Sequence, residues 1–367
     1  MDPVIGWPVL AAVLYAVYLF VGVFGAGTLV GLLEEVFFGQ VINPWLTAAV
    51  EALIPFPLVQ SFLVGEFGLF TMALTYSFAI VLPIVGTFFL AFGVLEDSGY
   101  LPRLAVMLDR AFRVMGLNGK AVLPMILGLG CDTMATMATR ILDSRKERIQ
   151  VTLLLALGVP CSAQLGVLLG MVGGVGLWAM LVWGGVVVAT MLVVGWLAAR
   201  VIPGKQSDFI LELPPMRLPE FGNVLVKTLA RMEWYLKEVV PIFVLGTALL
   251  FTLDLVGALA WIQQALSPLV VGWLGLPLEA TDALLIGFLR RDYGAAGLFD
   301  LAQQGLLDPV QIVVSMVVIT LFVPCIANFL MIVKEYGARI GLAVAATVFP
   351  LALLVGGVLN LMLGLVM

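Results

Sequence analysis

Long apolar stretches alternate with short basic groups along this chain, and this pattern predicts membrane-crossing helices. A helix needs roughly 20 residues to cross the hydrocarbon core of a bilayer. The apolar segments long enough for this are 4–30, 68–95, 149–171, 175–199, 238–260, 310–333 and 341–366. Two shorter apolar segments, 121–139 and 283–300, are interrupted by glycine and charge. The pattern therefore predicts an all-α polytopic membrane protein with about seven full spans and two broken hairpins.

The composition agrees with this fold class. Of the 367 residues, 62% are hydrophobic and 11% are charged, whereas a soluble domain carries roughly 25% charged residues. A soluble globular domain and a disordered chain are both excluded. The chain also contains no histidine, so reactions that need an imidazole are excluded.

The basic residues predict how the helices are oriented. Lysine and arginine in short loops stay on the cytoplasmic side, and eight of the 18 fall between Arg103 and Arg148. If 121–139 enters and leaves from the cytoplasm, this whole group faces the cytoplasm. The loops left outside, 31–66 and 261–282, contain acidic residues but no lysine or arginine. We therefore expect a plasma-membrane protein whose N terminus is cytoplasmic.

The chain also repeats itself. Pro83 matches Pro241, 158 residues later (241 − 83), and Pro160-Cys161 matches Pro324-Cys325, 164 residues later (325 − 161). In the predicted topology the two copies run in opposite directions. Inverted repeats with broken helices are typical of secondary transporters, whose substrate site lies between the repeats. The predicted domains are a first transmembrane helix with an acidic external segment (1–67), a first repeat (68–200), a cytoplasmic linker with an amphipathic helix (201–237) and a second repeat (238–367).

The first broken segment contains the most reactive side chains. Gly128, Gly130, Cys131, Asp132 and Thr133 interrupt an apolar run, and irregular backbone at membrane depth survives only where protein or a wet cavity satisfies it. An ionisable group at that depth marks a functional path by default. The alternative interpretation is that the glycines allow close packing and that Cys131 acts as a small hydrophobe.

Cys161 and Cys325 each follow a proline within an apolar segment. Proline frees a carbonyl one turn earlier, which a neighbour must satisfy, so the two cysteines are either paired ligands around one cavity or inert thiols at packing kinks. Sulfur and oxygen donors without imidazole favour a cation, and a transition metal over Mg²⁺ or Ca²⁺. The candidate metal ligands are Cys131, Asp132, Cys161, Cys325 and Asn328, and the candidate pathway residues beside them are Gly128, Gly130, Thr133, Met134 and Ser162.

Three further charges occupy the second broken segment. Arg290, Arg291 and Asp292 correspond to the Cys131-Asp132 break in the first repeat. They form either a gate with an internal ion pair or the cap of a short helix.

Two other features of the sequence are expected to play no part in chemistry. Glu96 and Asp97 end the second span, where a solvated helix end is expected. No string in the chain fits the phosphate-binding loop G-x-x-x-x-G-K-[ST], so no nucleotide site is expected.

These motifs together resemble the membrane part of the ferrous iron transport protein B family, which has paired gate (nucleoside-recognition-like) domains. The resemblance covers residues 68–350, and the motifs that carry it are Leu95-Glu-Asp-Ser-Gly-Tyr100, Gly130-Cys-Asp132, Pro160-Cys-Ser-Ala163, Gly287-Phe-Leu-Arg-Arg-Asp292 and Val323-Pro-Cys-Ile-Ala327. It implies a transporter rather than an enzyme, with Fe²⁺ as the substrate and no resident cofactor. It also implies that Cys131, Cys161 and Cys325 are pore or gate cysteines.

The chain departs from the family pattern in two ways. The family usually carries an N-terminal GTP-binding domain, whereas this chain starts at its first span, so a separate GTPase or a small accessory protein is an expected cytoplasmic partner. Asp132 replaces the usual Asn and Gln164 the usual Arg, and the added carboxylate is expected to strengthen cation binding. A homo-oligomer is left open, and no nucleic acid is expected.

Two alternatives to iron transport remain from the sequence. The first is a transporter of another divalent metal or of a nucleoside-like solute. The second is an intramembrane aspartyl protease, because Gly128 to Asp132 is one insertion away from G-x-G-D and Asp292 would supply a second carboxylate.

Overall fold

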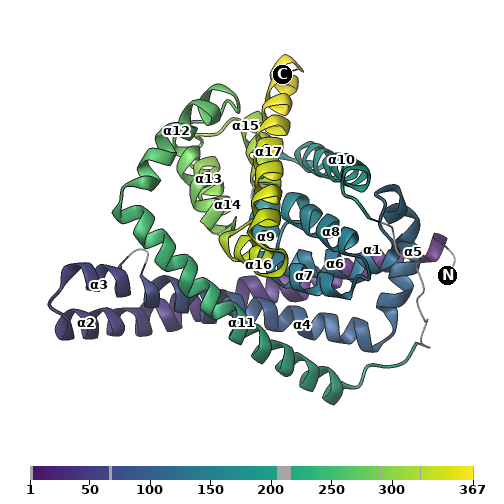
Figure 1. Cartoon of the computed structure of the whole chain (residues 1–367), viewed down its shortest axis with the longest axis horizontal. Helices are drawn as coiled ribbons and strands as arrows, with labels where there is room; N and C mark the ends of the chain where they lie inside the picture. Colours follow the sequence, from purple (N-terminus) through teal and green to yellow (C-terminus); the bar gives the residue numbers. More distant parts are fainter. Residues whose placement is uncertain (1–2, 66–67, 205–215, 290, 323, 367) are drawn as a thin grey trace. The chain divides into compact units, whose positions relative to one another are not determined.

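A computed structural model describes residues 3–65, 68–204, 216–289, 291–322 and 324–366 (Figure 1). Within these ranges the chain is helical and has no strand. It divides into two compact units, one formed by 1–103 and 212–260 and the other by 104–211 and 261–367.

The first unit contains the N-terminal helices and two later helices that contact each other. Its elements are α1 (Pro3–Val17), the π-helices η1 (Tyr18–Leu29) and η2 (Leu32–Ile42), α2 (Asn43–Leu53), α3 (Pro57–Val64), the π-helices η3 (Leu69–Leu74) and η4 (Tyr76–Val81), α4 (Leu82–Asp97) and α11 (Phe221–Leu255). Helix α4 packs along α11. Gly257, with a φ of +71°, follows α11 and ends it.

The second unit contains most of the remaining helices. These are α5 (Tyr100–Val114), α6 (Val122–Gly130), α7 (Asp132–Ala138), α8 (Arg145–Gly158), α9 (Ser162–Val175), α10 (Leu177–Val201), α12 (Ala258–Gly272), α13 (Glu279–Leu289), α14 (Arg291–Gln303), α15 (Pro309–Leu321), α16 (Ile326–Tyr336) and α17 (Ala338–Val366). Its core is apolar, and most of α8 and α15 is fully buried. Short 3₁₀ turns, η5 (Gly119–Ala121) and η6 (Thr139–Ile141), flank α6 and α7.

Five helices of the described chain are long and apolar enough to cross a membrane, or six if the bent pair α5 and α6 is counted as one. The sequence predicted seven. The predicted span 149–171 is two helices, α8 and α9, because Pro160 has no N–H and interrupts the run. The predicted span 238–260 and the predicted linker helix are one helix, α11. The first span does not end near residue 30, since helix continues from Tyr15 to Leu53.

The predicted repeat is confirmed by the order of the helices. The start of α5 precedes that of α12 by 158 residues (258 − 100), α7 precedes α14 by 159 (291 − 132), and α9 precedes α16 by 164 (326 − 162). Left-handed glycines, which turn the chain where other residues would be strained, recur with a similar spacing. They are Gly99 and Gly257, Gly116 and Gly275, and Gly176 and Gly337.

The start of one buried helix is repeated in the same way. Ser144 precedes α8, and its hydroxyl accepts the Glu147 backbone N–H at 3.2 Å. Asp308 precedes α15 164 residues later (308 − 144) and forms a reciprocal capping box with Gln311. Both caps satisfy N–H groups that a helix leaves unpaired at its start. The equivalent helices of the two repeats are therefore both stabilised by a side-chain N-cap.

The contacts between the repeats follow a two-fold pattern. Helix α9 contacts α14 as α16 contacts α7, and α10 contacts α15 as α17 contacts α8. Helices α8 and α15 occupy equivalent places and contact each other. Such reciprocal contacts are what a two-fold axis produces. The direction of each repeat across the membrane stays a prediction.

Both short apolar segments are broken, as predicted. Helices α6 and α7 are separated at Cys131 and contact each other, and α13 and α14 contact each other along a seam of small residues. A methyl group on Gly294 would collide with the Cα of Gly287 and would lie 2.6 Å from the Ala283 carbonyl oxygen. Since no atom there can move without displacing backbone, α13 and α14 need a glycine at 294.

We expect Gly294→Ala to destabilise the second unit by about 1–3 kcal/mol, because an added methyl overpacks the α13–α14 contact. Thermal unfolding in detergent would measure this as a lower midpoint. Gly184→Ala is the matched control, since a methyl group at Gly184, also helical, meets nothing within 4 Å. Equal midpoints for the two variants would contradict the close contact.

Candidate functional site

A buried ion pair joins the two broken hairpins. The Arg291 Nη1 lies 2.7 Å from the Asp132 Oδ2, and each side chain is only 3% exposed. Asp132 is the first residue of α7 and Arg291 the first of α14, so the pair links equivalent positions of the two repeats. Two like charges at such a position would repel each other, whereas this opposite pair is neutral.

The same guanidinium also satisfies three backbone carbonyls. It donates to the carbonyl oxygens of Ala156 at 2.7 Å, Val159 at 3.2 Å and Phe322 at 2.9 Å. Ala156 lies four residues before Pro160, which has no N–H to offer it. Val159 and Phe322 are the residues that follow α8 and α15. Arg291 thus closes the ends of two buried helices.

All three cysteines precede a helix start. Cys131, Cys161 and Cys325 are the N-cap residues of α7, α9 and α16, and each is half-buried. Cys161 and Cys325 follow their prolines at equivalent repeat positions, as predicted. The N-terminus of a helix carries a partial positive charge, which stabilises a thiolate once a metal has replaced its proton.

The Cys325 thiol lies near several members of the predicted set. Arg291, Cys131 and Asp132 all act on its thiol electrostatically, and the Asn328 backbone N–H bonds to its sulfur. The Asn328 side-chain oxygen accepts the Thr136 hydroxyl of α7 at 2.8 Å. The structure therefore brings Cys131, Asp132, Cys325 and Asn328 into one region with Arg291.

Four of the predicted pathway residues are buried. Gly128 and Gly130 are buried near the end of α6, and Thr133 and Met134 are buried in α7. A methyl group on Gly128 would lie 2.5 Å from the Leu155 side chain of α8. Gly128 therefore leaves room for the Leu155 side chain, and its role in a pathway stays a prediction.

Three predicted positions fall wholly or partly outside the described residues. Arg290 itself is not described. Ser162 begins α9 and Asp292 follows Arg291 in α14, but their side chains lie outside the described part. The protease hypothesis, which needs the Asp292 carboxylate, stays a prediction.

The predicted metal ligands are not gathered into a metal site in this conformation. Among the described residues, no three cysteine, aspartate or glutamate side chains lie close enough together to hold an ion. The Asp132 charge is balanced by Arg291. One carboxylate oxygen, Asp132 Oδ1, has no hydrogen-bond partner among the described atoms.

Comparison with known proteins places this arrangement in a family. A gate (nucleoside recognition) domain model matches the chain twice, at 78–175 and 236–339. The starts differ by 158 residues (236 − 78) and the ends by 164 (339 − 175). A model of the ferrous iron transport protein B C terminus matches 180–231. This chain belongs to the gate-domain family, in the form found in ferrous iron transport protein B.

Several relatives of this gate-domain protein are named Fe(2+) transporters. One from Methanocaldococcus jannaschii is 30% identical over 294 residues, which cover 70% of this chain and 43% of that protein. One from Staphylococcus aureus is 28% identical over 288 residues, which cover 71% of this chain and 43% of that protein. The match therefore spans less than half the length of these relatives. No solved structure matches the chain.

The sequence did not predict the contacts of several polar residues that hold the gate domains together. Gln164, noted only as a departure from the family, donates to the Ile319 carbonyl of α15 at 2.8 Å. The Tyr336 hydroxyl bonds to Thr139, and Arg140 pairs with Glu335 in the same region. For the Ala156 carbonyl, which Arg291 satisfies, the sequence did give an indication, because Pro160 four residues later has no N–H to donate to it. The tyrosine and glutamine contacts had no comparable pattern.

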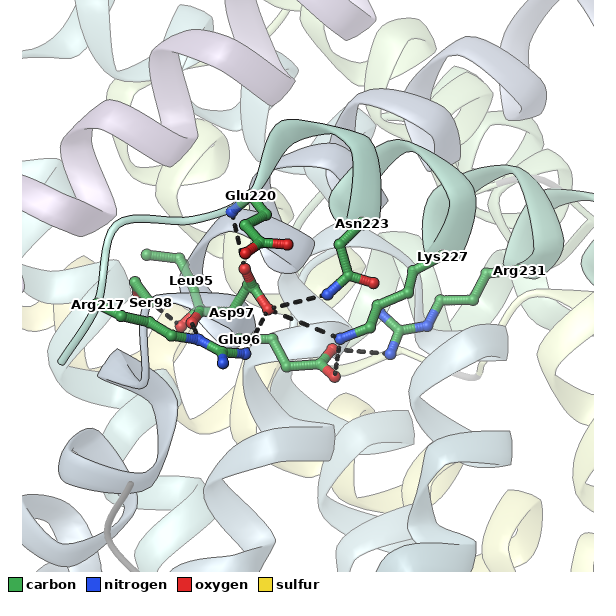
Figure 2. A network of polar contacts seen from close by, with 9 residues as sticks. All are labelled: Leu95, Glu96, Asp97, Ser98, Arg217, Glu220, Asn223, Lys227 and Arg231. Atoms are coloured by element: carbon green, nitrogen blue, oxygen red, sulfur yellow. Dashed lines mark hydrogen bonds and ion pairs between the residues drawn. The ribbon is translucent and has the colours of Figure 1, made fainter. Parts of the chain in front are cut away.

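A second polar cluster lies in the first unit, around the Glu96-Asp97 motif (Figure 2). The Asp97 side chain is 1% exposed and lies 2.9 Å from the Arg217 Nη2, so the expected solvated helix end is wrong for this residue. Its other oxygen accepts the Glu220 backbone N–H at 2.9 Å. Because α11 begins at Phe221, the carboxylate caps an otherwise unpaired N–H at the start of that helix.

Glu96 completes this cluster from the same helix end. It pairs with Arg231 at 2.7 Å and with Lys227 at 3.7 Å, both on α11 (Figure 2). The two carboxylates at the end of α4 therefore hold the N-terminal part of α11 through charge, beside the helix packing already described.

We expect Asp97→Asn to lower the thermal unfolding midpoint in detergent, because it removes both the charge facing Arg217 and the anionic cap of α11. Glu233→Gln is the matched control. Its carboxylate pairs with Lys237 on the same helix with both side chains largely exposed, and such pairs contribute little. If both substitutions shift the midpoint equally, the Asp97 carboxylate does not fasten α11.

Proposed function

We propose that this chain forms a membrane pathway for ferrous iron, lined by the broken helices of its two gate repeats. The observation that carries the proposal is the double gate-domain match together with relatives named as Fe(2+) transporters. Because the match leaves more than half of those relatives uncovered, the complete transport activity is inferred for this chain. Nucleotide control of this pathway would come from a GTP-binding partner or segment.

The chemistry of the helix ends supports a cation as the substrate. The partial positive charge at the N-termini of α9 and α16 stabilises a metal-bound thiolate at Cys161 and Cys325, and helix C-termini present carbonyl oxygens with partial negative charge. Thiolate and carboxylate donors without imidazole suit a borderline metal such as Fe²⁺ better than Mg²⁺. The proposed ligands are Cys131, Asp132, Cys161, Cys325 and Asn328.

Entry and release follow from the predicted topology. Fe²⁺ would approach from the acidic external loops, exchange part of its hydration shell for sulfur and oxygen ligands, and leave toward the cytoplasm. Several weak sites allow passage better than one strong site, because the ion must also leave. In this proposal the chain is a transporter with no catalytic residue.

A second candidate is transport of another divalent metal. The specific reason is Asp132, a carboxylate where the family usually has an amide, since oxygen ligands also suit Mn²⁺. A competition series with Mn²⁺, Zn²⁺, Co²⁺ and nucleosides against Fe²⁺ uptake would rank these solutes.

We expect Cys131→Ala and Asp132→Asn each to reduce Fe²⁺ uptake into proteoliposomes by about tenfold or more, the effect of losing roughly 1.4 kcal/mol of interaction. The assay would be anaerobic, with purified chain of verified thermal stability. Asp143→Asn is the matched control, because that carboxylate is exposed and pairs with Lys120 at 2.6 Å. Unchanged uptake in both site variants would refute this ligand assignment.

A further inference from the structure

The oxygens around the Arg291 guanidinium form the kind of ligand set that a metal cation takes. Asp132 contributes a carboxylate oxygen at 2.7 Å, and Ala156, Val159 and Phe322 contribute carbonyl oxygens at 2.7–3.2 Å. Carboxylate and carbonyl oxygens freed at broken helices coordinate cations in transporters. Here a side chain of the protein itself occupies that position.

The electrostatics of the position favour any cation. Val159 and Phe322 follow the C-terminal ends of α8 and α15, where the helix dipoles place partial negative charge. Asp132 adds a full negative charge that is buried to the same degree as Arg291. An ionised carboxylate buried without a cation is costly, so the position favours a bound positive charge.

The guanidinium does not use all of the hydrogen-bonding capacity at this position. Asp132 Oδ1 and Arg291 Nε are both buried without a hydrogen-bond partner among the described atoms. Arg291 bonds only to Asp132 Oδ2. The unpaired Oδ1 beside it could therefore serve as a further ligand for a metal ion. The thiol of Cys325 lies within electrostatic range of the same pair.

We propose that Arg291 is a tethered cation that competes with the transported metal for the position formed by Asp132 and the three carbonyls. The inference rests on the proposed function and adds its regulation. Metal would enter as the guanidinium withdraws, and the returning guanidinium would displace the metal. Arg291 thereby keeps metal affinity low enough for release and keeps the pathway closed when no metal is present.

The test is anaerobic equilibrium dialysis of Fe²⁺ on the detergent-purified chain. We expect Arg291→Ala to bind Fe²⁺ about tenfold more tightly or better than the unmodified chain, a change worth roughly 1.4 kcal/mol. Arg291→Lys is expected to give a smaller increase, because a compact ammonium cannot bond all four oxygens at once. Arg113→Ala is the matched control and should leave Fe²⁺ binding unchanged. The Arg113 side chain is 63% exposed, and its partner Asp109 lies on the same helix.

Chemical rescue makes the test specific. Millimolar guanidinium ion should displace Fe²⁺ from Arg291→Ala, since the free ion can occupy the vacated position, and should not affect the unmodified chain. Urea, which is planar and uncharged, is the control and should displace nothing. Displacement by urea as well as by guanidinium would contradict a charge-specific position.

The outcomes separate this inference from the proposed function. If the unmodified chain transports Fe²⁺ but neither Arg291 variant binds it more tightly, the tethered cation is wrong and transport stands. If the variants bind Fe²⁺ more tightly but the unmodified chain transports none, the transport proposal is wrong and the cation position stands. Should Arg291→Ala fail to fold, Arg291→Lys decides the binding result alone, because it keeps Asp132 paired.

Discussion

A helix that breaks inside a membrane exposes backbone groups that have no water to bind, and every such group needs a partner from the protein. In the second unit one guanidinium meets a large part of this requirement. Arg291 takes the carbonyls left by the ends of α8 and α15, and Asp132 balances the charge that this introduces. The pair therefore satisfies backbone carbonyls at the ends of both helices. Cys161 and Cys325 follow the ends of α8 and α15.

The repeat explains why the ion pair lies where it does. A two-fold axis brings equivalent residues of the two copies together, and the equivalent residues that begin α7 and α14 are Asp132 and Arg291. Identical charged residues at these two positions would repel each other. The copies have therefore kept the same backbone plan, down to the glycines with positive φ, while their side chains at this contact have opposite charges. A symmetric scaffold thus supports an asymmetric site.

The helix breaks also bring helix starts, with partial positive charge, and helix ends, with partial negative charge, into this region. The three cysteines lie at helix starts, where partial positive charge suits anionic sulfur, and Val159 and Phe322 lie at helix ends, which present oxygens. In the proposed pathway these helix ends would supply both sulfur and oxygen ligands. In the first unit the same physics works at a helix start, where the Asp97 carboxylate caps α11. In both units, buried carboxylates are held by arginine and by the ends of helices.

The sequence alone determined the membrane class, the repeat and the broken segments, because apolar length, proline and glycine act locally and over fixed spacings. Pro160 and Pro324 interrupt a helix wherever the chain folds. The tertiary structure decided which groups fill these interruptions. The repeat spacing makes Asp132 and Arg291 equivalent positions (291 − 132 = 159) but does not predict that their side chains meet, and no sequence pattern distinguishes the buried Asp97 from a solvated helix end. Those outcomes depend on which helices meet in space, since a charge is tolerated in an apolar interior only beside the partner that packing supplies.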